Sequence, residues 1–246
     1  MNNSLHFDPP VIGHRGACAY APENTMASFL KAAQLKLKWI EFDVMDSSDG
    51  VPVIFHDDYL DRTTNGKGLV NQYSFAYLQT LDAGKYFDPA FSCERIPSLL
   101  TVIEFLQDAK MSANIEIKTL PGHEEKLIQR VMKEMQPYMK AGNQQYLFSS
   151  FFPDALYALR KYSPDCQIGV LLHAWLNGWK DVCHELNCVS VHVNEAIMTE
   201  THAREIKEMG KSLLCYTVND PGRAKELFSW GVDAVFSDAP DLIARV

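Results

Sequence analysis

Two histidines at the ends of short apolar runs are the residues of this sequence best suited to proton transfer. His14 ends the run Val11–His14, and His56 ends the run Val51–His56. A lone histidine is more often structural, but two at strand ends beside several carboxylates are candidates for a general acid and a general base. Histidine suits both roles because its ordinary pKa lies near working pH.

Two carboxylates share one face of a predicted strand over Trp39–Met45. Side chains alternate along a strand, so Glu41 and Asp43 point to one face and the apolar residues between them to the other. Two ionised carboxylates cannot be buried together without compensation. A divalent cation would supply that compensation.

A third carboxylate follows the same pattern on the predicted strand Met111–Lys118. Glu116 shares a face with Asn114 and Lys118, while the isoleucines between them share the other. Three oxygen donors, without cysteines or histidines at zinc spacing, favour one hard cation, Mg²⁺ or Ca²⁺. A buried ion pair is the alternative for any one of the carboxylates, but it explains three of them poorly.

Two cationic side chains near these groups could bind an anion. Arg15 has a planar fork that matches phosphate oxygens, and Gly16 beside it allows close backbone approach. Lys118 lies one step beyond Glu116 toward the strand end. A cation, two anion-binding side chains and two proton carriers together suit the cleavage of a phosphodiester.

Repeated strand–helix units must position these residues. Apolar runs predict strands over Val11–His14, Trp39–Met45, Met111–Lys118, Tyr146–Ser150, Gln167–Leu172, Cys188–Asn194, Ser212–Val218 and Asp233–Ser237. Amphipathic stretches predict helices over Asn24–Lys36, Ser98–Lys110, Gly122–Met139, Pro153–Tyr162, Trp175–Asn187, Thr199–Met209 and Pro221–Trp230, and from Ala239 onward.

This alternation predicts an α/β protein, a (β/α)8 TIM barrel whose site lies at the C-terminal ends of the strands. An open doubly wound sheet is the alternative. It has less support, because no Gly-x-Gly-x-x-Gly pattern follows the first strand.

One interval is too long for a simple strand–helix connection. After the turn Ser47–Gly50, Val51–His56 predicts the returning arm of a hairpin, and residues 57–97 are rich in glycine, proline and aromatic residues. We expect a single domain, residues 1–246, with this inserted segment over the barrel mouth. The inserted segment could be a flap that covers apolar surface or a lid that shapes the pocket, and its composition is equally compatible with both.

Composition excludes several classes of partner. The 246 residues carry a net charge of −8, which argues against a nucleic-acid partner. No secretory signal and no membrane-spanning run is recognisable, so we expect a cytoplasmic protein without stable membrane association. The oligomeric state is not indicated. We expect all six cysteines to be reduced, with Cys166, Cys188 and Cys215 serving as small buried apolar residues.

The ordered motifs resemble the glycerophosphodiester phosphodiesterase family over nearly the whole chain. The motifs are His14-Arg15-Gly16, Pro22-Glu23-Asn24-Thr25, Glu41-Phe42-Asp43, His56-Asp57, Ile115-Glu116-Ile117-Lys118, Ser149-Ser150-Phe151, Tyr216-Thr217-Val218-Asn219 and Gly231-Val232-Asp233. Within this family, the sequence most resembles the bacterial cytoplasmic enzyme of the glycerol-phosphate uptake system. The stretch Cys188–His192 and the lack of a recognisable signal both fit that subgroup.

The resemblance implies a metal-assisted hydrolase of glycerol and lipid metabolism. Its small-molecule substrate is a glycerophosphodiester such as glycerophosphocholine or glycerophosphoethanolamine. A glycerol hydroxyl attacks first and gives a cyclic phosphate, which water opens to sn-glycerol 3-phosphate. Carried onto this chain, the resemblance implies metal ligands at Glu41, Asp43 and Glu116, acid–base histidines at His14 and His56, and phosphate contacts from Arg15 and Lys118.

Two aromatic residues are candidates for the walls of the glycerol pocket. They are Phe151 and Tyr216, and many family members carry tryptophan where Tyr216 stands. The alternative is that both are ordinary core aromatics. His192 and Asn194 share a face of their predicted strand and are weaker candidates for the barrel interior. The remaining histidines, His6, His123, His173, His184 and His202, are assigned no role.

Two other functions compete with this interpretation. A lysophospholipase D-like or phospholipase C-like phosphodiesterase of the same barrel group would act on lipids. A non-catalytic binding module would keep the pocket but should lack at least one of the two histidines or three carboxylates, and all five are present.

Overall fold

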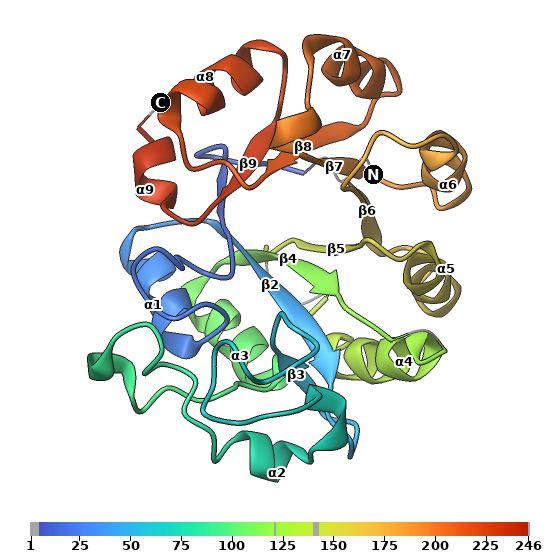
Figure 1. The fold of residues 1–246 in the computed structure, drawn as a ribbon. Helices are drawn as coiled ribbons and strands as arrows, with labels where there is room; N and C mark the ends of the chain where they lie inside the picture. Colours follow the sequence, from blue (N-terminus) through green and yellow to red (C-terminus); the bar gives the residue numbers. More distant parts are fainter. Residues whose placement is uncertain (1–4, 121, 140–142, 246) are drawn as a thin grey trace.

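Eight parallel strands close into a barrel in the computed structural model, which describes residues 5–120, 122–139 and 143–245 (Figure 1). The barrel strands are β1 (Val11–Gly13), β2 (Trp39–Asp46), β4 (Ser112–Ile117), β5 (Tyr146–Ser150), β6 (Gln167–Leu172), β7 (Ser190–Asn194), β8 (Ser212–Tyr216) and β9 (Ala234–Ser237). Each strand pairs with the next in chain order, and pairing of β1 with both β9 and β2 closes the ring. The predicted (β/α)8 barrel is therefore confirmed.

Helices follow the strands and cover the outside of the barrel. They are α1 (Met26–Gln34), α3 (Leu99–Ala109), α4 (Glu124–Met135), α5 (Pro153–Tyr162), α6 (Trp179–Glu185), α7 (Glu200–Glu208), α8 (Pro221–Ser229) and α9 (Pro240–Ile243). Helix α6 begins four residues later than predicted. Gly178, at φ +90°, directly precedes it, and a loop after β6 occupies the expected first turn.

Packing divides the strand side chains into two sets, as their alternation requires. The outward set packs under the helices in one large core; on β2 this set includes Ile40, Phe42 and Val44. A smaller cluster fills the barrel interior, with Ile12, Trp39, Leu147, Leu214, Ala234 and Phe236 as members. Apolar side chains therefore fill this part of the barrel interior.

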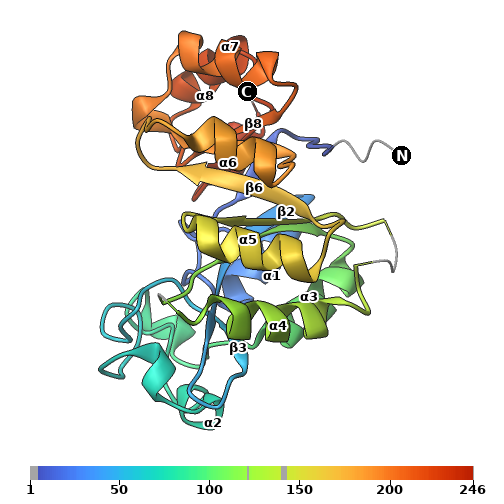
Figure 2. The same ribbon diagram turned by 90° about the vertical axis from the view of Figure 1, so that its right-hand side faces the viewer.

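The segment between β2 and α3 forms its own small apolar cluster. Strand β3 (Pro52–Ile54) pairs antiparallel with the end of β2, and α2 (Phe75–Leu78) follows it. The cluster members are Met45, Val53, Phe55, Leu60, Val70, Leu78, Leu81, Ala83 and Ile96. Figures 1 and 2 both place this segment at the opposite end of the molecule from α7 and α8. It covers the apolar surface of its own hairpin.

The prediction that every cysteine is reduced is wrong for one pair. Cys183 in α6 and Cys188 before β7 form a disulfide, with their Cα atoms 5.1 Å apart. Asn187, at φ +46°, reverses the chain between them, and the Cys188 amide donates to the Cys183 carbonyl oxygen. The turn thus brings the two sulfurs together. Cys166 and Cys215 are free and buried, as expected.

Within the described ranges, no helix combines the length and the apolar character needed to cross a bilayer.

Helix α1 depends on one aromatic anchor. Phe29 is fully buried and meets Phe42 of β2 edge-to-face, with ring centroids 5.8 Å apart. We predict that Phe29→Ala lowers the free energy of unfolding by roughly 3–5 kcal/mol, because it leaves a cavity under the helix. Leu30→Ala is the matched control, since Leu30 is 51% exposed, and should change it by less than about 0.5 kcal/mol. Equal effects in denaturant titrations would contradict this packing account.

Candidate active site

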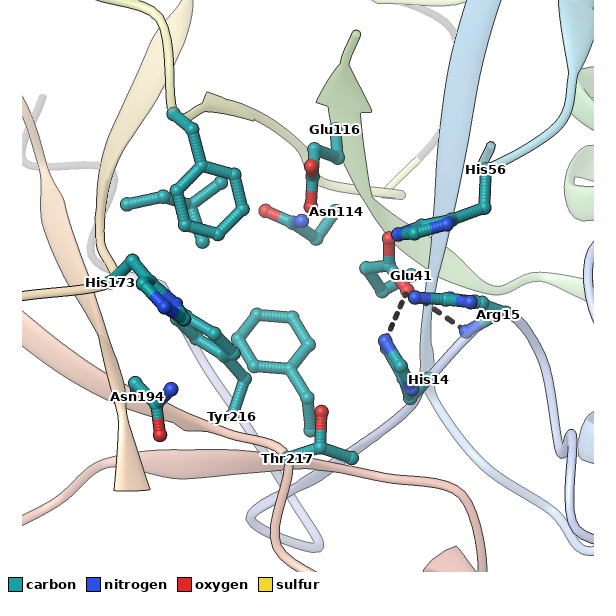
Figure 3. A pocket seen from close by; sticks show the side chains of 13 residues that line it. His14, Arg15, Glu41, His56, Asn114, Glu116, His173, Asn194, Tyr216 and Thr217 are labelled. Carbon is teal, nitrogen blue, oxygen red and sulfur yellow. Dashed lines mark hydrogen bonds and ion pairs between the residues drawn. The ribbon is translucent and has the colours of Figure 1, made fainter. Parts of the chain in front are cut away.

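The predicted site residues meet at the C-terminal end of the barrel. A cavity of about 290 Å³ opens there, lined by His14, Arg15, Glu41, His56, Asn114, Glu116, Phe151, Leu171, His173, Asn194, Tyr216, Thr217 and Phe236. Figure 3 shows His14, Arg15, Glu41 and His56 together on one side, with His173, Asn194 and Tyr216 on the opposite side. The cavity thus has a charged wall and a wall that is largely aromatic.

Three carboxylates converge beside the charged wall. Glu41 and Asp43 lie on β2, and the strand register pairs Asp43 with Glu116 on β4. One oxygen of each lies within 4.8 Å of the others. Burial and the neighbouring carboxylates raise the pKa of Glu41 well above its ordinary value, and burial and Asp43 raise that of Glu116 to about 8. These raised values mean that the cluster holds more negative charge than the protein compensates, so its donor set fits a hard divalent cation.

Asp43 is the best compensated of the three. Arg15 Nε lies 3.6 Å and Lys118 Nζ 3.7 Å from its oxygens, and the Asn24 amide donates to it at 2.8 Å. Although burial opposes ionisation, these neighbours lower the pKa of Asp43 below its ordinary value. Lys118 also lies 3.8 Å from Glu116, so both predicted anion-binding side chains stand at the carboxylate cluster.

His14 is held by a carboxylate that directly follows the last barrel strand. Its Nδ1 lies 2.6 Å from Asp238, which also accepts hydrogen bonds from Asn219 and from the Cys18 thiol. Burial opposes ionisation of Asp238, but these donors lower its pKa far below its ordinary value. An ionised Asp238 requires the proton on Nδ1, which leaves Nε2, 4.0 Å from Glu41, free to accept a proton.

His56 is held in the same way by its neighbour in the chain. Its Nδ1 lies 2.6 Å from Asp57, and Arg62 binds both oxygens of Asp57. Burial lowers the pKa of His56 more than the attraction of Asp43 raises it, and Arg15 and Lys118 lower it further. The ring is therefore mainly neutral near pH 7, with Nε2 available.

A chain of ion pairs connects the two halves of the charged wall. Arg62 of the inserted segment binds Glu23 with two hydrogen bonds, of 2.7 and 2.8 Å, besides its contacts with Asp57. Glu23 in turn accepts from Arg15 at 2.7 Å. The order is Arg15–Glu23–Arg62–Asp57–His56. The inserted segment thus fixes the histidine as well as covering apolar surface.

The two predicted aromatic walls line the cavity. Phe151 and Tyr216 meet edge-to-face with centroids 5.8 Å apart, and the Tyr216 hydroxyl donates to the Leu172 carbonyl oxygen. Phe151 is 37% exposed, so it is not an ordinary core aromatic. Asn194 lines the cavity, but His192 lies below it, fully buried, with Nε2 2.9 Å from the Ser190 hydroxyl.

Sequence reasoning did not assign several residues of the site. Asp238 follows the last barrel strand, which is a signal for a catalytic-end position. Asn114 shares the inward face of Glu116, and the same alternation could have assigned it to the cavity. His173 and Thr217 lie just after β6 and β8, in loops whose course the sequence does not define.

Comparisons with known proteins identify the family of this chain and agree with its fold. The chain matches the model of the glycerophosphoryl diester phosphodiesterase family over residues 14–242. It is 34% identical over 240 residues to a glycerophosphodiester phosphodiesterase of Caldanaerobacter subterraneus subsp. tengcongensis, covering 96% of both chains. It is 32% identical over 252 residues to one of Bacillus subtilis, covering 96% of this chain and 85% of the relative.

A solved structure is also similar over nearly its full length. An Oleispira antarctica phosphodiesterase in complex with the product sn-glycerol-3-phosphate is 39% identical, with a TM-score of 0.93 and 96% coverage of both chains. The chain therefore belongs to the glycerophosphoryl diester phosphodiesterase family, as its motifs predict. It is an enzyme, which argues against the non-catalytic binding module.

The raised pKa of Glu116 predicts how pH affects the metal-free protein. Folding raises this pKa from an ordinary 4.5 to about 8, so the native state holds a proton that the unfolded state releases. Stability should therefore fall as pH rises from about 4.5 to about 8, with Glu116 contributing on the order of several kcal/mol. Melting of chelator-treated protein at several pH values measures the effect, with Glu116→Gln as the variant whose melting temperature changes less.

Adding Mg²⁺ or Ca²⁺ at pH 8 should restore the lost stability of the wild type more than that of Glu116→Gln. Identical pH curves for the two proteins, without any response to either metal, would show that Glu116 is not part of a charged cluster.

Arg62 should act as a positioning residue for His56. Arg62→Met removes the two bonds that orient Asp57, so we expect kcat to fall by roughly 10–100-fold with a smaller change in KM. The pH–rate profile should also shift, because Asp57 stabilises the charged ring. Arg95→Met is the matched control, since the hydrogen bonds of this arginine of the same segment, as far as the structure describes the chain, run to backbone oxygens of Ser92 and Glu94. An unaltered kcat and pH profile in Arg62→Met would remove the ion-pair chain from the mechanism.

Proposed function

We propose that this chain hydrolyses glycerophosphodiesters to sn-glycerol 3-phosphate and an alcohol, with all of residues 1–246 as one catalytic domain. One observation carries the proposal: two histidines, each held through Nδ1 by a carboxylate, line one cavity beside a cluster of three carboxylates, of which Glu41 and Asp43 are buried and Glu116 is partly buried. The complex of the Oleispira antarctica relative with sn-glycerol-3-phosphate supports the same product.

The enclosed cavity suits the glycerol end of the substrate. Phe151 and Tyr216 offer apolar surface for its carbon chain. Asn114 donates to the Ser149 hydroxyl, while its Oδ1 is buried and has no partner among the described residues. That oxygen can accept a hydrogen bond from a glycerol hydroxyl. The volume of about 290 Å³ fits a small polar group.

The charged wall suits the phosphate. Arg15 lines this wall, and its Nε, 3.6 Å from Asp43, makes no hydrogen bond within the described residues, so the guanidinium adds positive charge beside the cavity. Lys118 adds a second positive charge. Glu41, Asp43 and Glu116 would hold one cation, Mg²⁺ or Ca²⁺, which would neutralise phosphate charge and acidify the attacking hydroxyl.

The two histidines divide the proton transfers. His14 Nε2 takes the proton of the glycerol 2-hydroxyl, whose oxygen then attacks phosphorus. His56 acts in its doubly protonated form, which Asp57 stabilises, and gives its Nε2 proton to the departing alcohol oxygen; its ring lines both the inner cavity and the groove outside it. The cyclic phosphate then opens as His56 takes a proton from water and His14 returns one to the 2-oxygen.

The remaining parts of this proposal follow from the sequence. The partner is a small-molecule glycerophosphodiester, without nucleic acid and without stable membrane association. A cytoplasmic location stays a prediction, and so does the binding of one divalent cation, Mg²⁺ or Ca²⁺.

Release of glycerol 3-phosphate from a glycerophosphodiester tests the proposal. His14→Ala and His56→Ala should each lower kcat by about 10²–10⁴-fold, because each removes a proton carrier. His184→Ala is the control, since His184 is exposed on α6 and lines neither the cavity nor the groove outside it. Near wild-type turnover in either site variant would remove that histidine from the mechanism. Absence of turnover in the metal-loaded wild type would overturn the proposed reaction.

A further inference from the structure

A second hollow lies directly outside the catalytic groups. It has a volume of about 610 Å³ and is lined by His56, Asp57, Asp58, Tyr59, Glu116, Lys118, Thr119, Leu120, Phe151 and Phe152. It shares His56, Glu116 and Phe151 with the inner cavity. A group attached to the phosphate on the side away from the glycerol would therefore enter this outer groove.

Exposed aromatic side chains line the outer groove from two directions. Tyr59, at the start of the inserted segment, is 56% exposed. Phe151 and Phe152, between β5 and α5, are 37% and 45% exposed. Three large rings in contact with water beside a catalytic histidine offer the surface that a bound group would cover.

The charges of the groove leave one carboxylate uncompensated. Lys118 is paired with Asp43 and Glu116, and Asp57 with Arg62 and His56. Asp58 is exposed and forms no ion pair within the described part of the chain. The free charge of the outer groove is therefore negative.

We propose that the outer groove is the subsite for the leaving alcohol and that it favours an alcohol carrying a quaternary ammonium group. This inference rests on the proposed function of the site. A quaternary ammonium cannot donate hydrogen bonds, so it is recognised by aromatic faces and a nearby negative charge. Tyr59, Phe152 and Asp58 supply both. A neutral polyol gains neither interaction, and an anionic alcohol meets repulsion from Asp58.

An acyl chain is a poorer occupant of the same groove. A free carboxylate at its wall opposes burial of a hydrocarbon chain. In a lysophospholipid, moreover, the acyl chain is attached to the glycerol, which enters the inner cavity rather than the outer groove.

Kinetics with two substrates that differ only in the alcohol test the proposal. The ratio of kcat/KM for glycerophosphocholine to that for glycerophosphoglycerol should be roughly tenfold in the wild type. It should fall toward one in Tyr59→Leu, Phe152→Leu and Asp58→Asn. Tyr77→Leu is the matched control, because Tyr77 of the inserted segment is 40% exposed but does not line the groove. Choline alone should inhibit the wild type competitively, and Asp58→Asn less.

Each other outcome overturns the inference in a distinguishable way. A wild-type ratio near one, or equal losses on both substrates in the variants, would remove the ammonium subsite but keep the proposed function. Faster turnover of lysophosphatidylglycerol than of glycerophosphoglycerol, lost in the groove variants, would assign the groove to an acyl chain, because neither substrate carries an ammonium group. Turnover of neither glycerophosphodiester would overturn the proposed function itself.

Discussion

Mutual repulsion among three carboxylates, two buried and one partly buried, is the constraint on which the rest of the site depends. Glu41, Asp43 and Glu116 cannot all be ionised in the barrel mouth unless positive charge reaches them. The backbone of Arg15 adopts φ +48°, which places its amide 2.9 Å from Glu41 while its guanidinium reaches Asp43. One residue in a sparsely populated conformation thus serves two of the three carboxylates, and a cation completes the compensation.

The same arrangement explains why the barrel needs its inserted segment. His14 receives its carboxylate from the barrel itself, through Asp238 after β9. His56 stands outside the ring of parallel strands, after β3, and has no barrel strand behind it. Its support comes from Asp57 and Arg62, which are anchored through Glu23 to the first strand–helix connection. The segment therefore completes the acid–base pair and also supplies one wall of the outer groove.

Local patterns sufficed to predict the barrel and the residues of its charged wall. Alternation on β2 and β4 put the carboxylates on one inward face, because strand geometry has a fixed period. Pairings across long sequence separations could not be derived in this way. His14 and Asp238 are 224 positions apart, and Arg62 is 39 positions from Glu23. The disulfide between Cys183 and Cys188 depends on a left-handed turn at Asn187, which composition and redox expectations did not reveal.

Anomalous diffraction from crystals grown with Mn²⁺ would test the central claim most directly. The account predicts one strong peak within about 2.0–2.6 Å of an oxygen of each of Glu41, Asp43 and Glu116. A peak instead among His14, Cys18 and Asp238, the other group within the described residues whose ligand atoms lie close enough together to hold an ion, would contradict it. So would an active crystalline enzyme with no peak between the three carboxylates.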